Sequence, residues 1–378
     1  MKKYALCILS ISLIACGDST RSELRVRRID FEDNNKIELK KENVICQFVP
    51  LETTDASLFD GIETVEISND RLFIINQKCD KVLAFDRTGK FIAQIGSYGK
   101  GLGEYINPYV LHIDYEKKRI SIADRTGSKL LHYRLDNYKY ISSQPLFNFT
   151  SCAWLNDGNI AWFYQAGFDT GKREKYYIKV TDQNLNKIGY LYPVVFASHY
   201  GVYAGQPIYQ YNKNVFLNIS YLSVIQIINK KSITPAYQIS FGSHHMPSLE
   251  WLQKIGANDA NYAMKLINSE YISSYNIKET DSLLSVYYLV NGGHSYVGFY
   301  DKVKNISYKY TTDKFLEITE LYGLTSSVGV FNNYFVASIM PNVLKQHEIK
   351  RDDLRSLLVN ISDEDNPILC LFKINTNN

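Results

Sequence analysis

Four histidines fall in segments whose composition is typical of connections between strands. They are His199, His244, His245 and His294. An imidazole can bind a metal or exchange hydrogen bonds with a ligand. A metal site needs three or four ligands that converge, and convergence cannot be seen in a sequence. We therefore treat the four histidines as candidate binding residues and predict no metal and no other cofactor.

Two tyrosines, Tyr200 and Tyr203, lie in a connection that is rich in tyrosine between residues 190 and 211. A phenol ring can stack on a sugar or a peptide while its hydroxyl forms a hydrogen bond. This connection is therefore the best candidate for a carbohydrate- or peptide-binding platform. Packing between neighbouring strands is the other use of so many aromatic side chains, and the sequence leaves both uses open.

No motif in the chain indicates a catalytic residue. No serine lies in the Gly-x-Ser-x-Gly setting of a nucleophile elbow. Gly99, Gly101 and Gly103 follow a strand-like segment, as the glycines of a phosphate-binding loop do. Pro108 and another strand-like segment follow them, so no helix is available to bind a phosphate. These glycines therefore predict a tight turn, with Glu104 as its cap.

The first residues predict an export signal with a lipid anchor. Lys2 and Lys3 precede an apolar run over residues 4–15, which is shorter than the roughly 20 residues that span a bilayer. Such a segment is typical of a signal peptide, here residues 1–15, that is removed. The run ends in Leu-Ile-Ala-Cys, which resembles the lipobox of bacterial lipoproteins. The resemblance implies that Cys16 is acylated and holds the protein on a membrane, and Gly17 after it implies the outer membrane.

The charge balance excludes nucleic acid as a partner. The chain has 42 Lys and Arg residues against 39 Asp and Glu residues, and two of the lysines belong to the predicted signal peptide. A nearly neutral chain offers no basic surface to phosphates. The most basic stretch, residues 21–28, lies in a predicted tether over residues 16–40. We expect this tether to be a solvated linker that precedes a single folded domain over residues 41–378.

A strand-like unit recurs along the chain and predicts the fold. Arg71 and Arg119 are 48 residues apart, as are Asn76 and Asp124 and two further pairs in the same two units. Similar strands begin at six positions, which are 71, 119, 159, 214, 283 and 334. Units of about 50 residues are typical of propeller blades with four strands. The sequence therefore predicts an all-β, six-bladed β-propeller in which this recurring strand opens each blade.

Three segments do not fit the repeat. Residues 248–269 and 343–358 carry apolar side chains at helical spacing, and we expect two short helical insertions there. The apolar segment 44–51 lies before the first repeat. We expect it to form a strand in the last blade, which closes the ring and removes an exposed edge. Cys46 and Cys370 would then lie on adjacent strands, and a disulfide between them is a hypothesis.

A resemblance to a known family follows from the glycine-rich segment. Residues 89–105, GKFIAQIGSYGKGLGEY, resemble a blade junction of NHL-type propellers, and Asn107-Pro108 and a strand follow as in that pattern. The segment Asp365-Asn366-Pro367 matches another recurring feature of such proteins. Together with the lipobox, these motifs resemble the NHL- and TolB-like six-bladed β-propeller lipoproteins of Gram-negative anaerobes. That family has no assigned activity.

These patterns predict a lipid-anchored propeller of the cell envelope that binds or scaffolds without catalysis. Its ligand would be a carbohydrate or a partner protein. The alternative is a lactonase or lyase of the kind that related propellers support, with a metal in the central channel. Three or more Asp, Glu, Asn or His side chains that meet at the axis would favour the enzyme, and an apolar axis would favour the scaffold.

Overall fold

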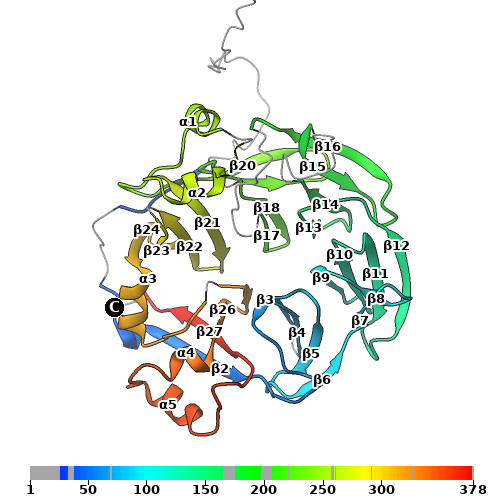
Figure 1. The fold of residues 1–378 in the computed structure, drawn as a ribbon. Helices are drawn as coiled ribbons and strands as arrows, with labels where there is room; N and C mark the ends of the chain where they lie inside the picture. The colour runs from blue at the N-terminus through cyan, green and yellow to red at the C-terminus, as the bar shows by residue number, and fades with distance from the viewer. Residues whose placement is uncertain are drawn as a thin grey trace, which may run out of the picture.

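The structure is a computed structural model, and it describes residues 26–32, 38–68, 70–164, 175–196, 207–219, 221–256, 259, 261–290, 292–325 and 327–376. Within these ranges six sheets surround a common axis, so the prediction of a six-bladed β-propeller is confirmed (Figure 1). The predicted signal peptide, Cys16, His199, Tyr200 and Tyr203 lie outside the described residues.

Each blade is a sheet of four antiparallel strands that follow one another outward from the axis, and the last blade takes its outermost strand from the start of the chain. The first three blades are β3 (Ile62–Ile67), β4 (Arg71–Asn76), β5 (Val82–Asp86) and β6 (Phe91–Gln94); β9 (Pro108–Asp114), β10 (Arg119–Asp124), β11 (Lys129–Arg134) and β12 (Tyr140–Pro145); and β13 (Ser151–Trp154), β14 (Ile160–Phe163), β15 (Tyr176–Thr181) and β16 (Lys187–Pro193). The last three are β17 (Ile208–Tyr211), β18 (Asn214–Leu217), β19 (Val224–Ile228) and β20 (Ile233–Ser240); β21 (Ile272–Glu279), β22 (Leu283–Val290), β23 (His294–Asp301) and β24 (Ile306–Thr311); and β25 (Gly329–Phe331), β26 (Tyr334–Ile339), β27 (Ile368–Ile374) and β2 (Val44–Pro50).

The recurring strand of the sequence repeat is the second strand of every blade, not the first. The predicted starts match β4, β10, β14, β18, β22 and β26. These strands are continuous apolar runs because neighbouring blades bury both of their faces. In β4, Phe73 and Ile75 pack against the second blade, whereas Leu72 and Ile74 pack against the last blade. The phase of the prediction was therefore wrong by one strand.

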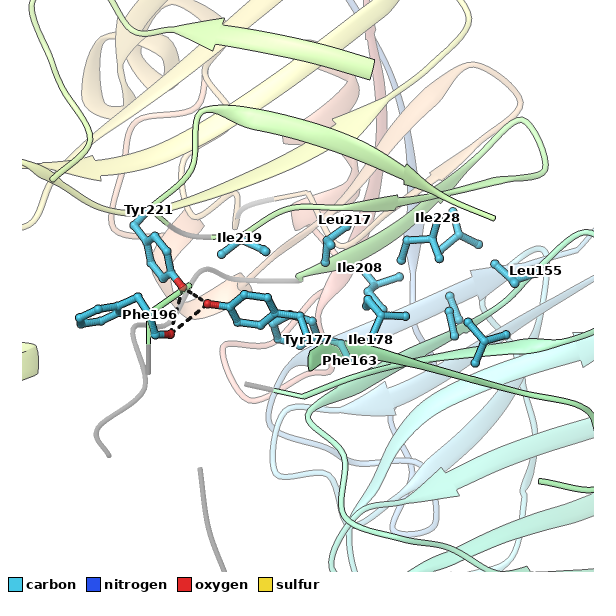
Figure 2. Packing of buried hydrophobic residues seen from close by; sticks show 14 of the residues in the cluster. Leu155, Phe163, Tyr177, Ile178, Phe196, Ile208, Leu217, Ile219, Tyr221 and Ile228 are labelled. Atoms are coloured by element: carbon cyan, nitrogen blue, oxygen red, sulfur yellow. Dashed lines mark hydrogen bonds between the residues drawn. The ribbon is translucent and has the colours of Figure 1, made fainter. Parts of the chain in front are cut away.

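The core consists of separate apolar clusters between adjacent blades. In the wedge between the third and fourth blades, Phe163 and Ile178 face Ile208 and Leu217 (Figure 2). Helices α1 and α2, whose bounds are given below, cover this wedge with Leu252 and two further buried residues. Comparable clusters fill the other five interfaces. Stacking of sheets on both sides thus replaces the single core of an ordinary domain.

The N-terminal strand closes the ring, as predicted. β2 pairs antiparallel with β27, with Val44 opposite Ile374 and Pro50 opposite Ile368. In Figure 1 the blue β2 lies beside the red β27. Because the first and last segments share one sheet, neither can leave without opening the ring.

Cys46 and Cys370 lie on these paired strands, which confirms the prediction that their strands are adjacent. Both are free thiols. Cys46 is opposite Phe372 and Cys370 is opposite Phe48, so the two cysteines are diagonal neighbours. Diagonal neighbours have Cα atoms about 7–8 Å apart, beyond the reach of an unstrained disulfide. The hypothetical disulfide is therefore not formed in this structure.

Part of the predicted tether belongs to the propeller. β1 (Arg27–Asp30) pairs parallel with β20 as a fifth strand of the fourth blade. Ile29 and Phe31 are fully buried there and contact the fifth blade. The prediction that residues 16–40 form a solvated linker is thus wrong for residues 27–31, because two apolar side chains among the basic ones fill a gap between blades.

The two ends of the ring differ in the length of the connections that they carry. The turns that join first to second strands and third to fourth strands are short, and they form what we call the turn face. The connections from second to third strands and from one blade to the next form the opposite end, which we call the insertion face. Every α-helix in the described ranges lies in one of the connections of the insertion face. The long connections therefore gather at one mouth of the ring.

Helices occur in both segments where the sequence predicted them, and the structure has further elements that were not predicted. The segment 248–269 contains α1 (Leu249–Lys254) and α2 (Tyr262–Ile267), and α4 (Pro341–Leu344) and α5 (Asp352–Leu358) correspond to the second predicted insertion. A further helix, α3 (Thr312–Thr319), was not predicted. The remaining elements are the short helix η1 (Lys41–Asn43) and the strand pair β7 (Ser97–Tyr98) and β8 (Glu104–Tyr105). All helices in the described ranges are too short or too polar to traverse a lipid bilayer.

Candidate functional site

A pocket of about 470 Å³ opens on the insertion face beside the fifth blade. Three of the histidines predicted from the sequence line it, although they come from two separate connections. Its lining consists of Ser243, His244, His245, Glu270, Tyr271, Val290, His294 and Tyr296. The structure therefore brings His294 together with His244 and His245, the nearer of which lies 49 residues earlier in the chain.

Two local features bring these connections together. The β20–β21 connection carries His244 and His245, and the backbone nitrogen of Ile272 donates to the carbonyl oxygen of His245 at 2.9 Å. The β22–β23 turn contains Gly292 and Gly293, both with positive φ, as a tight hairpin before His294 requires. The nitrogen of Gly292 donates to the carbonyl oxygen of Ile267 at the end of α2, which fixes the turn against the helix.

The aromatic rings on one side of the pocket pack closely against one another, and one histidine belongs to this group. Nδ1 of His244 lies 2.9 Å from the hydroxyl of Tyr288. The rings of Tyr288 and Tyr296 stack with centroids 5.1 Å apart, and the His244 ring lies 4.7 Å from that of Tyr296. His245 and His294, by contrast, are exposed, and so is Glu270. The pocket thus combines ordered aromatic rings with accessible polar groups.

Sequence reasoning missed the other lining residues. Glu270 and Tyr271 follow the helical insertion and Tyr296 lies within a strand, so no local pattern distinguished them. The group of three histidines and a glutamate resembles a set of metal ligands. In the described ranges, however, no three or more His, Cys, Asp or Glu side chains lie close enough together to hold a metal ion.

Part of the tyrosine-rich connection is used for packing, although Tyr190 is exposed. Tyr192 packs against the wedge between the third and fourth blades, and Tyr209 is buried with its hydroxyl 3.1 Å from Oε1 of Glu279. The hydroxyls of Tyr177 and Tyr221 converge on the carbonyl oxygen of Phe196 (Figure 2). These contacts support the packing interpretation for this part of the segment.

The glycine-rich turn is closed by its own glutamate, as predicted. Oε2 of Glu104 accepts a hydrogen bond from the backbone nitrogen of Gly101 at 2.7 Å. A Cβ atom at Gly99 would lie 2.1 Å from the same oxygen. The position that a phosphate would need is therefore filled by a carboxylate.

A second cavity, of about 200 Å³, occupies the central channel. The innermost strands line it, and they contribute charged groups to a surface that is partly polar and partly apolar. Glu63 and Glu66 come from β3, His112 comes from β9 and Lys278 comes from β21. The His112 ring stacks on that of Trp154 with centroids 4.4 Å apart. Two carboxylates and one imidazole thus line the axis, together with a single amine. Within the part of the chain that the structure describes, however, no three such groups lie close enough together to hold a metal ion, so they do not meet at one point as the enzyme alternative requires.

The channel walls shift the pKa values of these groups. Burial raises the pKa of Glu66 to about 7, and the attraction of Lys278 only partly opposes this effect. Burial likewise lowers the pKa of Lys278 to about 8, against the attraction of Glu66 and Glu63. The Glu66 side chain is accessible from the cavity, but protein surrounds it and restricts its hydration. The channel therefore holds an acid and a base that both titrate close to neutral pH.

This shift predicts a pH effect on stability. An ordinary glutamate titrates near 4.5, whereas Glu66 titrates near 7 in the folded protein, so folding favours its protonated form. The resulting stabilisation is complete below pH 4.5 and is lost as the pH rises through 7. We expect the Tm of the natural protein to fall over this interval relative to that of the Glu66→Gln variant.

The exposed Glu116, on a turn between β9 and β10, provides the control. Glu116→Gln is expected to keep the pH profile of the natural protein. Thermal unfolding of the three proteins from pH 4.5 to pH 8 measures the effect. Identical slopes for Glu66→Gln and the natural protein would contradict the assignment.

Comparisons with known proteins agree with this architecture. The sequence matches the family model DUF5128, described as a 6-bladed β-propeller, over residues 18–338. The chain is similar to a solved structure from Bacteroides fragilis, described as an exported protein, with a TM-score of 0.84 and 29% identity over 92% of this chain and 99% of that one. A DUF4221 member from Bacteroides vulgatus shares the fold, with a TM-score of 0.58 and 13% identity over 89% and 99% of the two chains. No curated protein matches the sequence.

Proposed function

Because the chain belongs to the DUF5128 family of six-bladed β-propellers, we propose that it is a lipid-anchored envelope protein that binds a carbohydrate on its insertion face. It acts without catalysis, by holding a ligand in the pocket that His244, His245 and His294 line. A partner protein on the same face is the other occupant that the sequence suggests, and the experiment below distinguishes the two.

The pocket on the insertion face is the observation that carries this proposal. Its volume of about 470 Å³ lies within the range of about 300–1,000 Å³ that is typical of small-ligand sites. Sugars present apolar C–H faces and hydroxyl groups, which suit stacked tyrosines beside exposed imidazoles and a carboxylate. Tyr271 and Tyr296 offer the ring surfaces, and His245, His294 and Glu270 offer the hydrogen-bonding groups.

Export and anchoring rest on the start of the sequence. The apolar run over residues 4–15 and the cysteine at position 16 support cleavage and acylation there. The similar protein from Bacteroides fragilis is described as exported. We therefore place this chain in the cell envelope, attached through Cys16, with Gly17 favouring the outer membrane.

The ligand is tested by thermal shift of the purified protein against a panel of mono- and oligosaccharides, since binding to the folded state raises Tm. His245→Ala and His294→Ala are expected to weaken binding of any active sugar about tenfold each, the effect of losing roughly one hydrogen bond to a ligand. Both side chains are exposed, so neither change should unfold the protein.

His347 is the matched control, because it is an exposed histidine on the insertion face outside the pocket. His347→Ala should leave sugar affinity unchanged. A panel in which no sugar raises Tm would contradict the carbohydrate proposal and favour the partner protein. Equal effects of the three alanine variants would show that the pocket is not the site.

A further inference from the structure

The two cysteines at the ring closure differ sharply in their surroundings. Cys46 is half-buried on β2, the outermost strand of its sheet, whereas Cys370 is fully buried on β27. Both side chains contact the same apolar cluster, and the two cysteines are diagonal neighbours on paired strands. They therefore lie next to each other on one face of the sheet.

A guanidinium group lies near Cys46 and is paired with a carboxylate. The Arg351 side chain, of which 8% is exposed, comes from the connection that carries α4 and α5, and its Nη2 lies 3.0 Å from Oδ2 of Asp353. Nη2 also donates to the carbonyl oxygen of Val44, two residues before Cys46, at 3.4 Å. The neighbouring thiol of Cys370 and the charge of Arg351 lower the pKa of Cys46, against the effects of burial and of Asp353, while burial raises the pKa of Cys370. The pair thus consists of a half-buried thiol with a lowered pKa and a fully buried thiol with a raised pKa.

The other described cysteines lack such a setting. Burial raises the pKa of Cys79 to about 12 and raises that of Cys152 as well. Neither lies beside a second cysteine, and both are buried. They serve as internal controls for the chemistry of the pair.

We propose that Cys46 and Cys370 are a redox-active pair that reversibly fastens β2, the outermost strand of the last blade, to β27, the last strand of the chain. The oxidant is a disulfide, of a small thiol or of a protein. The thiolate of Cys46 attacks one of its sulfurs, which forms a mixed disulfide and releases one thiolate. Cys370 gives up its proton, attacks the sulfur of Cys46 and releases the second thiol. Two cysteines are oxidised and one external disulfide is reduced to two thiols.

The register explains why this bond is labile. A disulfide between diagonal neighbours needs their Cα atoms to approach from about 7–8 Å. β2 pairs with β27 on one edge only, so it can shift toward its neighbour at the expense of its own register. The strain makes the bond easier to reduce than an ordinary structural disulfide. The oxidised ring would be covalently closed, and reduction of the disulfide would remove this link.

The test treats the full chain, purified in detergent, with oxidised glutathione and identifies the products by peptide mass mapping. The natural protein should yield a linked pair of peptides containing Cys46 and Cys370, and dithiothreitol should reverse it. Cys370→Ser should stop at glutathione on Cys46, because the resolving thiol is absent. Cys46→Ser should give neither product, and Cys152→Ser should behave like the natural protein.

A rate measurement tests the role of the arginine. Alkylation of Cys46 in the reduced protein should have its pH midpoint below the 8.5 or so of an ordinary thiol. It should also be about tenfold faster than that of Cys370 at neutral pH. Arg351→Lys, which keeps a cation but loses the guanidinium geometry, should raise the midpoint. Failure of Cys370→Ser to accumulate the glutathione adduct, or an ordinary midpoint for Cys46, would overturn the proposal.

Discussion

Replacing Val44 with aspartate is expected to unfold the protein, whereas the same replacement at Ile45 leaves it folded. The Val44 side chain is 3% exposed and faces the cluster between the last two blades, while that of Ile45 is 41% exposed on the other side of β2. An unpaired carboxylate at the buried position costs several kcal/mol. At the exposed position the cost is about 1 kcal/mol, the range of strand propensity.

The pair of variants tests the ring closure and its register together. A shift of β2 by one residue would exchange the faces and reverse the order of the two effects. Chemical denaturation of both variants, followed by tryptophan fluorescence, measures the difference. If the two variants lose equal stability, β2 does not close the last blade as the structure has it.

Replacing Glu279 with alanine is expected to lower the free energy of unfolding by about 3–5 kcal/mol. Glu279 is 1% exposed and its Oε2 lies 2.6 Å from Nζ of Lys302. The hydroxyls of Tyr209 and Tyr237 donate to the same carboxylate at 3.1 and 2.9 Å. These contacts join the fourth and fifth blades. Loss of the carboxylate would leave the ammonium group of Lys302 without its counter-ion, although it still donates to the carbonyl oxygen of Thr280. It would also leave the two tyrosine hydroxyls without this acceptor.

The exposed ion pair of Lys314 and Glu317 on α3 is the control. Its nitrogen and oxygen are 3.0 Å apart, but more than half of each side chain is exposed. Glu317→Ala should cost less than about 1 kcal/mol, as is usual for surface pairs. A double replacement, Glu279→Leu with Lys302→Met, should recover much of the loss, because it removes both charges. Equal losses for Glu279→Ala and Glu317→Ala would contradict the buried network.

The sequence predicted those parts of the fold whose signal is local or periodic. The second strand of each blade is buried on both faces and reads as an apolar run, so its six copies were found. The innermost strands face the channel, and charged residues such as Glu63 and Glu66 interrupt their apolar pattern. For this reason most of them were missed, although the strand after Asn107-Pro108, which is β9, was predicted. Strand β1 was missed because Ile29 lies among basic and acidic residues that resemble a linker.

The candidate site was only partly predictable. His244, His245 and His294 were identified individually, because glycines and turn residues mark their segments. Their convergence depends on the hairpin docking against α2, which no local pattern reveals. Glu66 lies on β3 of the first blade and Lys278 lies on β21 of the fifth blade. Each has a shifted pKa only because the ring closes around both. Such a pair arises from the fold and cannot be recognised from the spacing of residues in the sequence.

The direction of β1 bears on how a lipid-anchored ring would face a bilayer. Arg27 is opposite Tyr237 and Asp30 is opposite Ser240, so β1 begins at the turn face and runs toward the insertion face. If the lipid is on Cys16, the ten residues from there to Val26 would span about 35 Å at most. The turn face would then lie on the side of the bilayer, and the histidine pocket would open toward the surrounding medium.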